Sequence, residues 1–184
     1  MSDERGSVLL AIARESLVEA LGLGQGNGYS HPWLRELGAT FVTLMRSGQL
    51  RGCVGSLRAY RPLFDDVRSN ARAAAFSDTR FPPLHRDEFP EIAVEVSLLS
   101  IPEEVRVSCD EEACAVLRPG VDGVIFECEE CRSTFLPQVW GQLPDPRDFL
   151  GQLKRKAGLP PGYWRPEVRL WRYTVVKWAE RERQ

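Results

Sequence analysis

Residues 39–57, ATFVTLMRSGQLRGCVGSL, constrain the fold more than any other segment. Two stretches rich in apolar and β-branched residues flank Ser47 and Gly48, a combination typical of a β-hairpin. Adjacent apolar residues such as Phe41 and Val42 fall on opposite faces of the first strand. The segment therefore predicts an antiparallel sheet in which this first strand is central.

Helical and strand periodicities alternate along the rest of the chain. They predict helices over residues 8–21, 62–76, 108–117 and 146–158, strands over 91–100 and 167–180, and a second hairpin over 121–140. No run of strand–helix–strand units suggests a doubly wound parallel sheet. The expected fold is α+β, with mainly antiparallel sheets flanked by helices. Because no linker is evident, any two lobes are expected to be intimately joined.

Composition limits the classes of function. The chain has 184 residues, a net charge of −2 and five cysteines, an odd number that does not suggest a secreted disulfide framework. No apolar run is long enough for a membrane span, and the expected location is cytoplasmic. Residues 51–86 carry seven arginines against three aspartates. This basic segment suits an anionic ligand, although solvated faces are the simpler interpretation for most of these arginines.

Cys53 is the candidate nucleophile. Side chains alternate along a strand, so Arg51, Cys53 and Gly55 are expected on one face. A neighbouring guanidinium stabilises a thiolate, and a glycine would leave the sulfur uncovered on one side. The alternative is a buried thiol that packs as a small hydrophobic side chain.

Four further residues are candidates because of their surroundings. Arg80 lies in a proline-stiffened loop, which suits an anion ligand. Glu95 and Ser97 share one face of the predicted strand 91–100, an unusual pair to bury. Gln138 interrupts an apolar strand, where its amide needs a hydrogen-bond partner.

The remaining cysteines and the histidines give weaker signals. Cys128 and Cys131 bracket two glutamates and could pair or bind a metal, but a single Cys-x-x-Cys is weak evidence for zinc, and no metal site is predicted. His85 could act as a base, although a surface loop histidine is the simpler interpretation; His31 is the other histidine.

The chain resembles the AMMECR family, named for the Alport, midface hypoplasia and elliptocytosis chromosomal region. LRGCVG, RFPPL and FLPQV occur here in the order and approximate spacing of that family, and the likeness runs from about residue 8 to 180. It implies one α+β domain over 8–180, with a larger lobe holding both termini and a smaller lobe inserted, the motif segment lying near their cleft. Asp78-Thr79 departs from the Asp-Pro common in the family. The residues that match family motifs are Arg51, Cys53, Gly55, Arg80, Pro82, Glu95, Ser97 and Gln138.

The family has no settled activity, and the resemblance names no cofactor. It implies a component of a modification pathway beside a MEMO-type protein and a radical S-adenosylmethionine protein. The enzymatic hypothesis is that Arg51 and Arg80 bind a small anionic or nucleotide-like ligand, with Cys53 as nucleophile and Glu95 or His85 handling protons. One alternative is a non-catalytic adaptor for the partner enzymes. A second is RNA or nucleotide binding by the basic segment, against which the overall acidity argues.

Overall fold

The computed structural model describes residues 2–181 and divides into two compact units. Unit 1 contains the described parts of residues 1–99 and 176–184, and unit 2 contains residues 100–175. Within the described residues, no helix has the length and apolar character needed to cross a membrane. The architecture combines helices with antiparallel sheets, so the predicted α+β class is confirmed.

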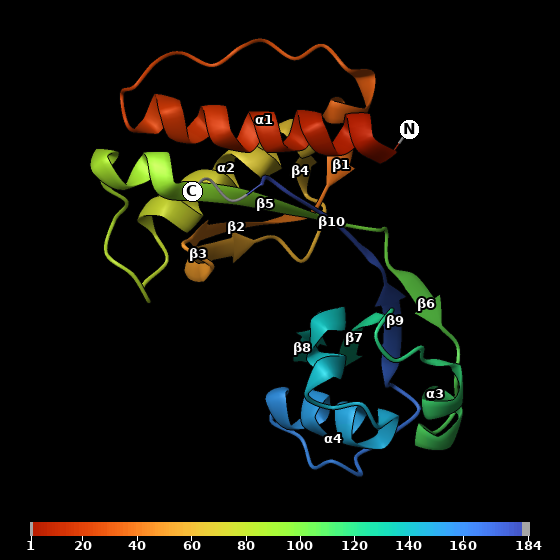
Figure 1. The fold of residues 1–184 in the computed structure, drawn as a ribbon. Coiled ribbons are helices and arrows are strands. Elements are labelled where there is room, and N and C mark those ends of the chain that lie inside the picture. Colours follow the sequence, from red (N-terminus) through yellow and green to blue (C-terminus); the bar gives the residue numbers. More distant parts are fainter. Residues whose placement is uncertain (1, 182–184) are drawn as a thin grey trace. The chain divides into compact units, whose positions relative to one another are not determined.

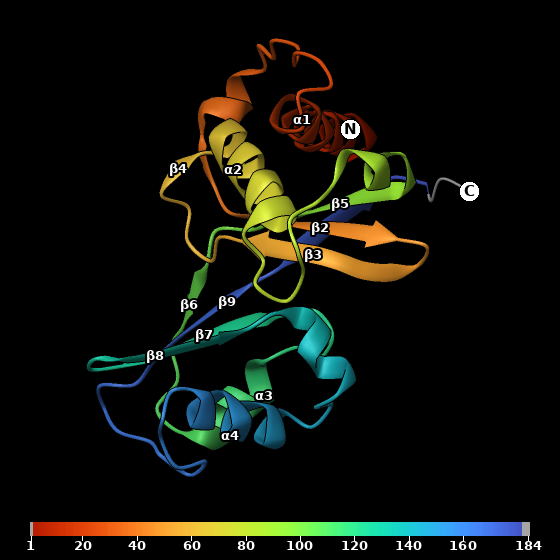
Figure 2. The same cartoon turned by 90° about the vertical axis from the view of Figure 1, so that its left-hand side faces the viewer.

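Unit 1 is a four-stranded sheet with two helices on one face. The strand order is β10-β5-β2-β3, and β2 pairs antiparallel with both β3 and β5. Helices α1 and α2 cover the same face of this sheet (Figures 1 and 2). The elements are α1 (Ser2–Ala20), β2 (Thr40–Arg46), β3 (Gln49–Gly55), α2 (Leu63–Phe76), β5 (Ile92–Leu99) and β10 (Val175–Ala179).

The core of unit 1 follows from the helical spacing of apolar residues in α1 and from the alternation of side chains along the strands. Leu9, Ile12 and Leu17 form one stripe of α1 and are almost fully buried. They pack in one cluster with alternate strand residues, including Val42 and Val94. The strand residues between these core positions therefore point to the face turned away from α1 and α2.

Unit 2 has the same kind of construction on a smaller scale. Its sheet has the order β6-β9-β7-β8, and α3 and α4 pack on one face of it. Asp145 caps α4 by accepting a hydrogen bond from the backbone N–H of Arg147 at 2.8 Å. The elements are β6 (Glu103–Val105), α3 (Asp110–Val116), β7 (Gly123–Cys128), β8 (Cys131–Phe135), α4 (Pro146–Lys156) and β9 (Arg169–Tyr173).

Short elements complete the chain. A small two-stranded sheet joins β1 (Leu37–Gly38) to β4 (Arg61–Pro62). Three 3₁₀ helices follow loop segments: η1 (Pro32–Arg35), η2 (Arg86–Glu91) and η3 (Pro137–Gly141). Each contains proline, which lacks the N–H needed to continue a strand ladder or an α-helix interior.

The first hairpin and the last three helices lie close to their predicted ranges, whereas α1 begins at Ser2 instead of residue 8 and the second hairpin ends at Phe135 instead of residue 140. The last strand also differs from the prediction. Residues 167–180 were expected as one strand, whereas β9 and β10 belong to different sheets. The interruption falls at Thr174, whose backbone N–H donates to the Ser100 hydroxyl at 3.0 Å. Alternation of side chains along a strand cannot reveal this change of sheet, because β-branched and aromatic residues continue on both sides of it.

Candidate functional site

Four side chains form a line across the sheet of unit 1, on the face turned away from α1 and α2. Cys53 on β3 pairs directly with Thr43 on β2, and Thr43 pairs with Glu95 on β5. Lys177 on β10 continues the line, with its Nζ 2.6 Å from the Glu95 Oε2. Directly paired residues share a face with their side chains in reach of each other. We call Cys53, Thr43, Glu95 and Lys177 the polar row.

The Cys53 thiol is half-buried and has a hydrogen-bond donor beside it. The Thr43 hydroxyl donates to the sulfur at 3.3 Å. The thiol that the sequence singles out is therefore not sealed in the hydrocarbon core.

The Cys53 backbone is held by a loop that follows α2. Because β3 is an edge strand, its outward peptide groups need partners outside the sheet. The Cys53 N–H donates to Asp78 Oδ2 at 2.8 Å, and its carbonyl accepts from Arg80 Nη2 at 3.3 Å. This loop contains the predicted ligand Arg80, and it fixes the position of the thiol.

Asp78 and Arg80 also bind each other. Arg80 donates to both carboxylate oxygens of Asp78, at 2.9 and 2.7 Å. These hydrogen bonds, followed by the one from the Cys53 N–H, hold the pKa of Asp78 well below its usual range. The pairing with Asp78 raises the pKa of Arg80. Arg80 is the guanidinium next to Cys53, and about half of its side chain is exposed.

Arg51 lies elsewhere than predicted. Simple alternation would place it beside Cys53, but the β2–β3 register shifts at this point and leaves Arg51 unpaired as a bulge. Its side chain is buried and donates to both oxygens of Glu88 on η2, at 2.9 and 3.0 Å. The prediction that Arg51 flanks the thiol is therefore wrong, because a bulge breaks the alternation on which it rested.

Gly52 and Gly55 lie where neighbouring groups pack directly against the strand backbone and leave no room for a side chain. A Cβ on Gly52 would lie 2.1 Å from the carbonyl oxygen of Ala74, so α2 approaches the strand backbone directly. A Cβ on Gly55 would lie 2.3 Å from the Phe41 ring. Phe41 therefore fills the space that Gly55 was expected to leave open. Phe41 also pairs with Ser97 on β5, which places Ser97 one pair along from the polar row.

Gln138 belongs to unit 2, where it is exposed on η3. The expected apolar strand ends at Phe135, and Pro137 starts the 3₁₀ helix. An exposed amide can be hydrogen-bonded by water, so the predicted need for a buried partner does not arise. His85 is also exposed, and its backbone N–H donates to Glu88 at 3.0 Å.

A buried polar cluster at one end of β2 and β3 was missed by the sequence analysis. Asp66 on α2 is fully buried and accepts hydrogen bonds from Thr40, Ser56, Arg61 and Asn70. The signal was present, because residues four apart on a helix share a face, and 66 and 70 fall among the apolar positions of α2. Ser56 directly follows β3, so this cluster anchors the chain just beyond the motif.

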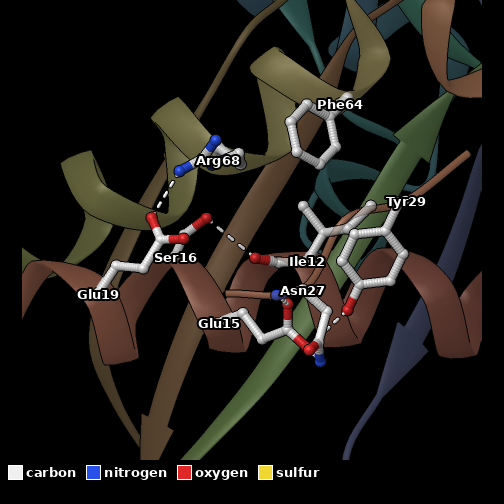
Figure 3. A pocket seen from close by; sticks show the side chains of 8 residues that line it. All are labelled: Ile12, Glu15, Ser16, Glu19, Asn27, Tyr29, Phe64 and Arg68. Atoms are coloured by element: carbon white, nitrogen blue, oxygen red, sulfur yellow. Dashed lines mark hydrogen bonds and ion pairs between the residues drawn. The ribbon is translucent and has the colours of Figure 1, made fainter. Parts of the chain in front are cut away.

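A second polar cluster joins α1, α2 and the loop that follows α1 (Figure 3). Glu15 accepts from the Tyr29 hydroxyl at 2.7 Å and from the Asn27 backbone N–H at 2.8 Å. Burial opposes ionisation of Glu15, but these hydrogen bonds outweigh it and lower its pKa. The cavity here has a volume of about 20 Å³, enough for one water molecule. It is therefore a structural contact rather than a ligand site.

The Arg51–Glu88 pair should make the protein sensitive to acid. The hydrogen bonds from Arg51 lower the pKa of Glu88 from 4.5 to about 2. A carboxylate with a lowered pKa stabilises the fold fully above its ordinary value and loses that contribution as the pH falls toward 2. We expect Glu88→Gln to be less stable near neutral pH and to lose less stability between pH 4.5 and 2. Urea unfolding at several pH values measures both effects.

Glu91→Gln is the matched control. Glu91 forms an ion pair with an arginine, Arg46, but half of the Glu91 side chain is exposed. Exposed ion pairs contribute little. If both variants change the pH dependence equally, the buried Arg51–Glu88 pair is not its source.

Together, these features define an α+β protein with a candidate thiol site on one sheet. The AMMECR1 family model matches residues 10–178. A protein of Methanothermobacter thermautotrophicus is 39% identical over 181 residues, covering 94% of this chain and 93% of its own. A protein of Saccharolobus islandicus is 38% identical over 176 residues, covering 89% of this chain and 76% of that protein. The chain belongs to the AMMECR1 family.

A solved structure supports the same assignment. The crystal structure of an uncharacterised protein from Pyrococcus horikoshii has a TM-score of 0.81 and 32% sequence identity to this chain. The match covers 97% of this chain and 93% of that one. It supports the fold and the family.

Proposed function

We propose that this protein is the thiol-bearing component of a modification pathway, with Cys53 as its nucleophile. The observation that carries the proposal is the polar row, in which a half-buried thiol receives a hydrogen bond from Thr43 and has a carboxylate and an ammonium group further along the same face. A fixed backbone, a donor to the sulfur and access from outside the core are the requirements of a reactive cysteine.

The ligand class follows from one cation beside the polar row and one within it. Arg80 and Lys177 are each about half exposed, and each is paired with one carboxylate. A small anionic or nucleotide-like group could replace those carboxylates as the partner of the exposed guanidinium and ammonium groups. Arg51 is less suited to this role because its side chain is buried as well as bound by Glu88.

Glu95 acts on the bound substrate in this scheme and not on the thiol. Two strand spacings separate β5 from β3, or about 10 Å. The thiol gives its proton to solvent, and the thiolate attacks an electrophilic carbon of the substrate. An S–C bond forms and the leaving group departs with its electron pair. In this proposal Glu95, which is paired with Lys177, exchanges a proton with that leaving group.

The partners we propose are a MEMO-type protein and a radical S-adenosylmethionine protein, on the strength of family membership. All five cysteines are free, which is consistent with a reducing compartment and supports a cytoplasmic location. Co-purification of the tagged chain from its host, with Lys177→Glu as the comparison, tests the partnership. Lys177 is a cleaner site for this test than Arg51, because a change at Arg51 would also break its buried pair with Glu88.

Alkylation by iodoacetamide at neutral pH tests the thiol itself. We expect Cys53 to react faster than free cysteine. Thr43→Val should slow the reaction about tenfold, since a hydrogen bond to a charged group is lost. Peptide mapping by mass spectrometry measures the rate at Cys53 separately from the other cysteines.

Thr43→Ser is the matched control, because it keeps the hydroxyl and should react at close to the original rate. A Cys53 rate no faster than that of free cysteine would contradict the nucleophile. If alkylation of Cys53 also leaves partner binding intact while Lys177→Glu abolishes it, the surface serves as an adaptor.

A further inference from the structure

The hairpin of unit 2 holds two cysteines in direct register. Cys128 ends β7, Cys131 begins β8, and the two residues pair across the strands. The turn between them consists of Glu129 and Glu130, and Glu129 has a φ of 52°. A left-handed residue at this position is typical of the tight two-residue turns that hold hairpin strands together.

The register brings the two thiols within reach of a covalent bond. Directly opposed residues of an antiparallel pair have Cα atoms about 4.5–5.5 Å apart, and both side chains lie on one face. A disulfide spans Cα distances of roughly 4.4–6.8 Å. Both cysteines are free thiols in this structure. A disulfide can therefore form here without separating the strands.

The two thiols differ in access. Cys128 is buried and lies 3.3 Å from the Tyr163 hydroxyl, with which it shares a hydrogen bond. Cys131 is only half-buried. An oxidant in solution therefore meets Cys131 first, and Cys128 is the thiol placed to react next.

We propose that Cys128 and Cys131 form a reversible disulfide when a hydroperoxide oxidises the protein, making the hairpin a redox-modification site separate from the polar row. The Cys131 thiolate attacks the peroxide, an S–O bond forms as the O–O bond breaks, and hydroxide or alkoxide leaves. The Cys128 thiol then attacks the Cys131 sulfenic acid. The S–S bond forms and water leaves, so two thiols have lost two electrons to one peroxide.

A metal is a weaker explanation for this pair. Two thiolates supply half of the four ligands that structural zinc takes. Among residues 2–181, no three cysteine, histidine or acidic side chains come together in a way that could hold a metal ion. Pairing between the thiols needs no further ligand.

Closure of the disulfide also changes the hydrogen bond between Cys128 and Tyr163. Either group can donate while Cys128 is a thiol, whereas only the Tyr163 hydroxyl can donate once the sulfur has lost its hydrogen. Tyr163 packs against the core cluster of unit 2 from the segment between α4 and β9. Oxidation of the hairpin would therefore alter a contact of the segment between α4 and β9, which belongs to the same unit.

The test treats the reduced, full-length protein with a small excess of hydrogen peroxide and then labels the remaining thiols with N-ethylmaleimide under denaturing conditions. We expect Cys128 and Cys131 both to lose their labels relative to the untreated protein, whatever happens at Cys53. A Glu-specific protease that cuts after Glu129 and Glu130 should leave the Cys128 and Cys131 fragments joined. A thiol reductant should separate them and restore both labels.

Variants check the assignment and the order of reaction. Cys114→Ser, a change at another cysteine of unit 2, should still lose the labels at Cys128 and Cys131 to peroxide. Cys131→Ser should not form the cross-link, and Tyr163→Phe should form it about fivefold faster, because the Cys128 thiol is released from its hydrogen bond. Fragments that separate without reductant would overturn the proposal, as would a Cys131 that proceeds to sulfinic acid in the unaltered protein.

Discussion

Asp66→Asn is expected to lower the free energy of unfolding by about 3 kcal/mol, since it removes one partner from a buried charged network. The Asp66 carboxylate is fully buried. It accepts from the Thr40 N–H at 2.8 Å, the Ser56 hydroxyl at 2.7 Å and the Arg61 Nε at 2.8 Å. An amide would turn an NH₂ group toward donors and leave the Arg61 guanidinium without its counter-charge.

Asp65→Asn is a matched control. Both aspartates lie in the first turn of α2, so both interact with the helix dipole, but Asp65 is exposed. Urea unfolding of the two variants separates the buried network from the dipole effect. Equal losses in the two variants would show that the network contributes nothing of its own.

Gly52→Ala should be comparably damaging, for a steric reason. The new Cβ would lie 2.1 Å from the Ala74 carbonyl oxygen, which belongs to the backbone of α2 and cannot rotate away. Either the helix or the strand must shift, at a cost of about 3 kcal/mol. The shift would also move Cys53, the next residue. We therefore expect lower stability in urea together with altered alkylation of Cys53.

Two other glycines provide the comparison. Gly28→Ala should be nearly neutral, because no atom lies within 4 Å of the new Cβ. Gly55→Ala should fall between the two, since the group in its way is the Phe41 side chain. If Gly52→Ala unfolds at the same urea concentration as Gly28→Ala, the close approach of α2 is not a constraint on the fold.

The parts of the site that the sequence predicted are those that depend on strand alternation within regular pairing. Cys53 and Glu95 were singled out separately, and both lie in the polar row. Arg51 was misplaced because one extra residue in β3 changes which face it occupies. Lys177 was not singled out, since no local pattern identifies the strand that will lie beside β5.

The sequence alone determined the main helices and hairpins, the α+β class and the family, because these depend on periodicity, turn residues and short motifs that act over a few positions. Only the tertiary structure decided which charges meet. Glu88 pairs with Arg51 from 37 residues away, and Asp78 reaches the Cys53 backbone from 25 residues away. Such contacts are fixed by how helices and loops pack against the sheet, and side-chain spacing along the chain carries no record of that packing.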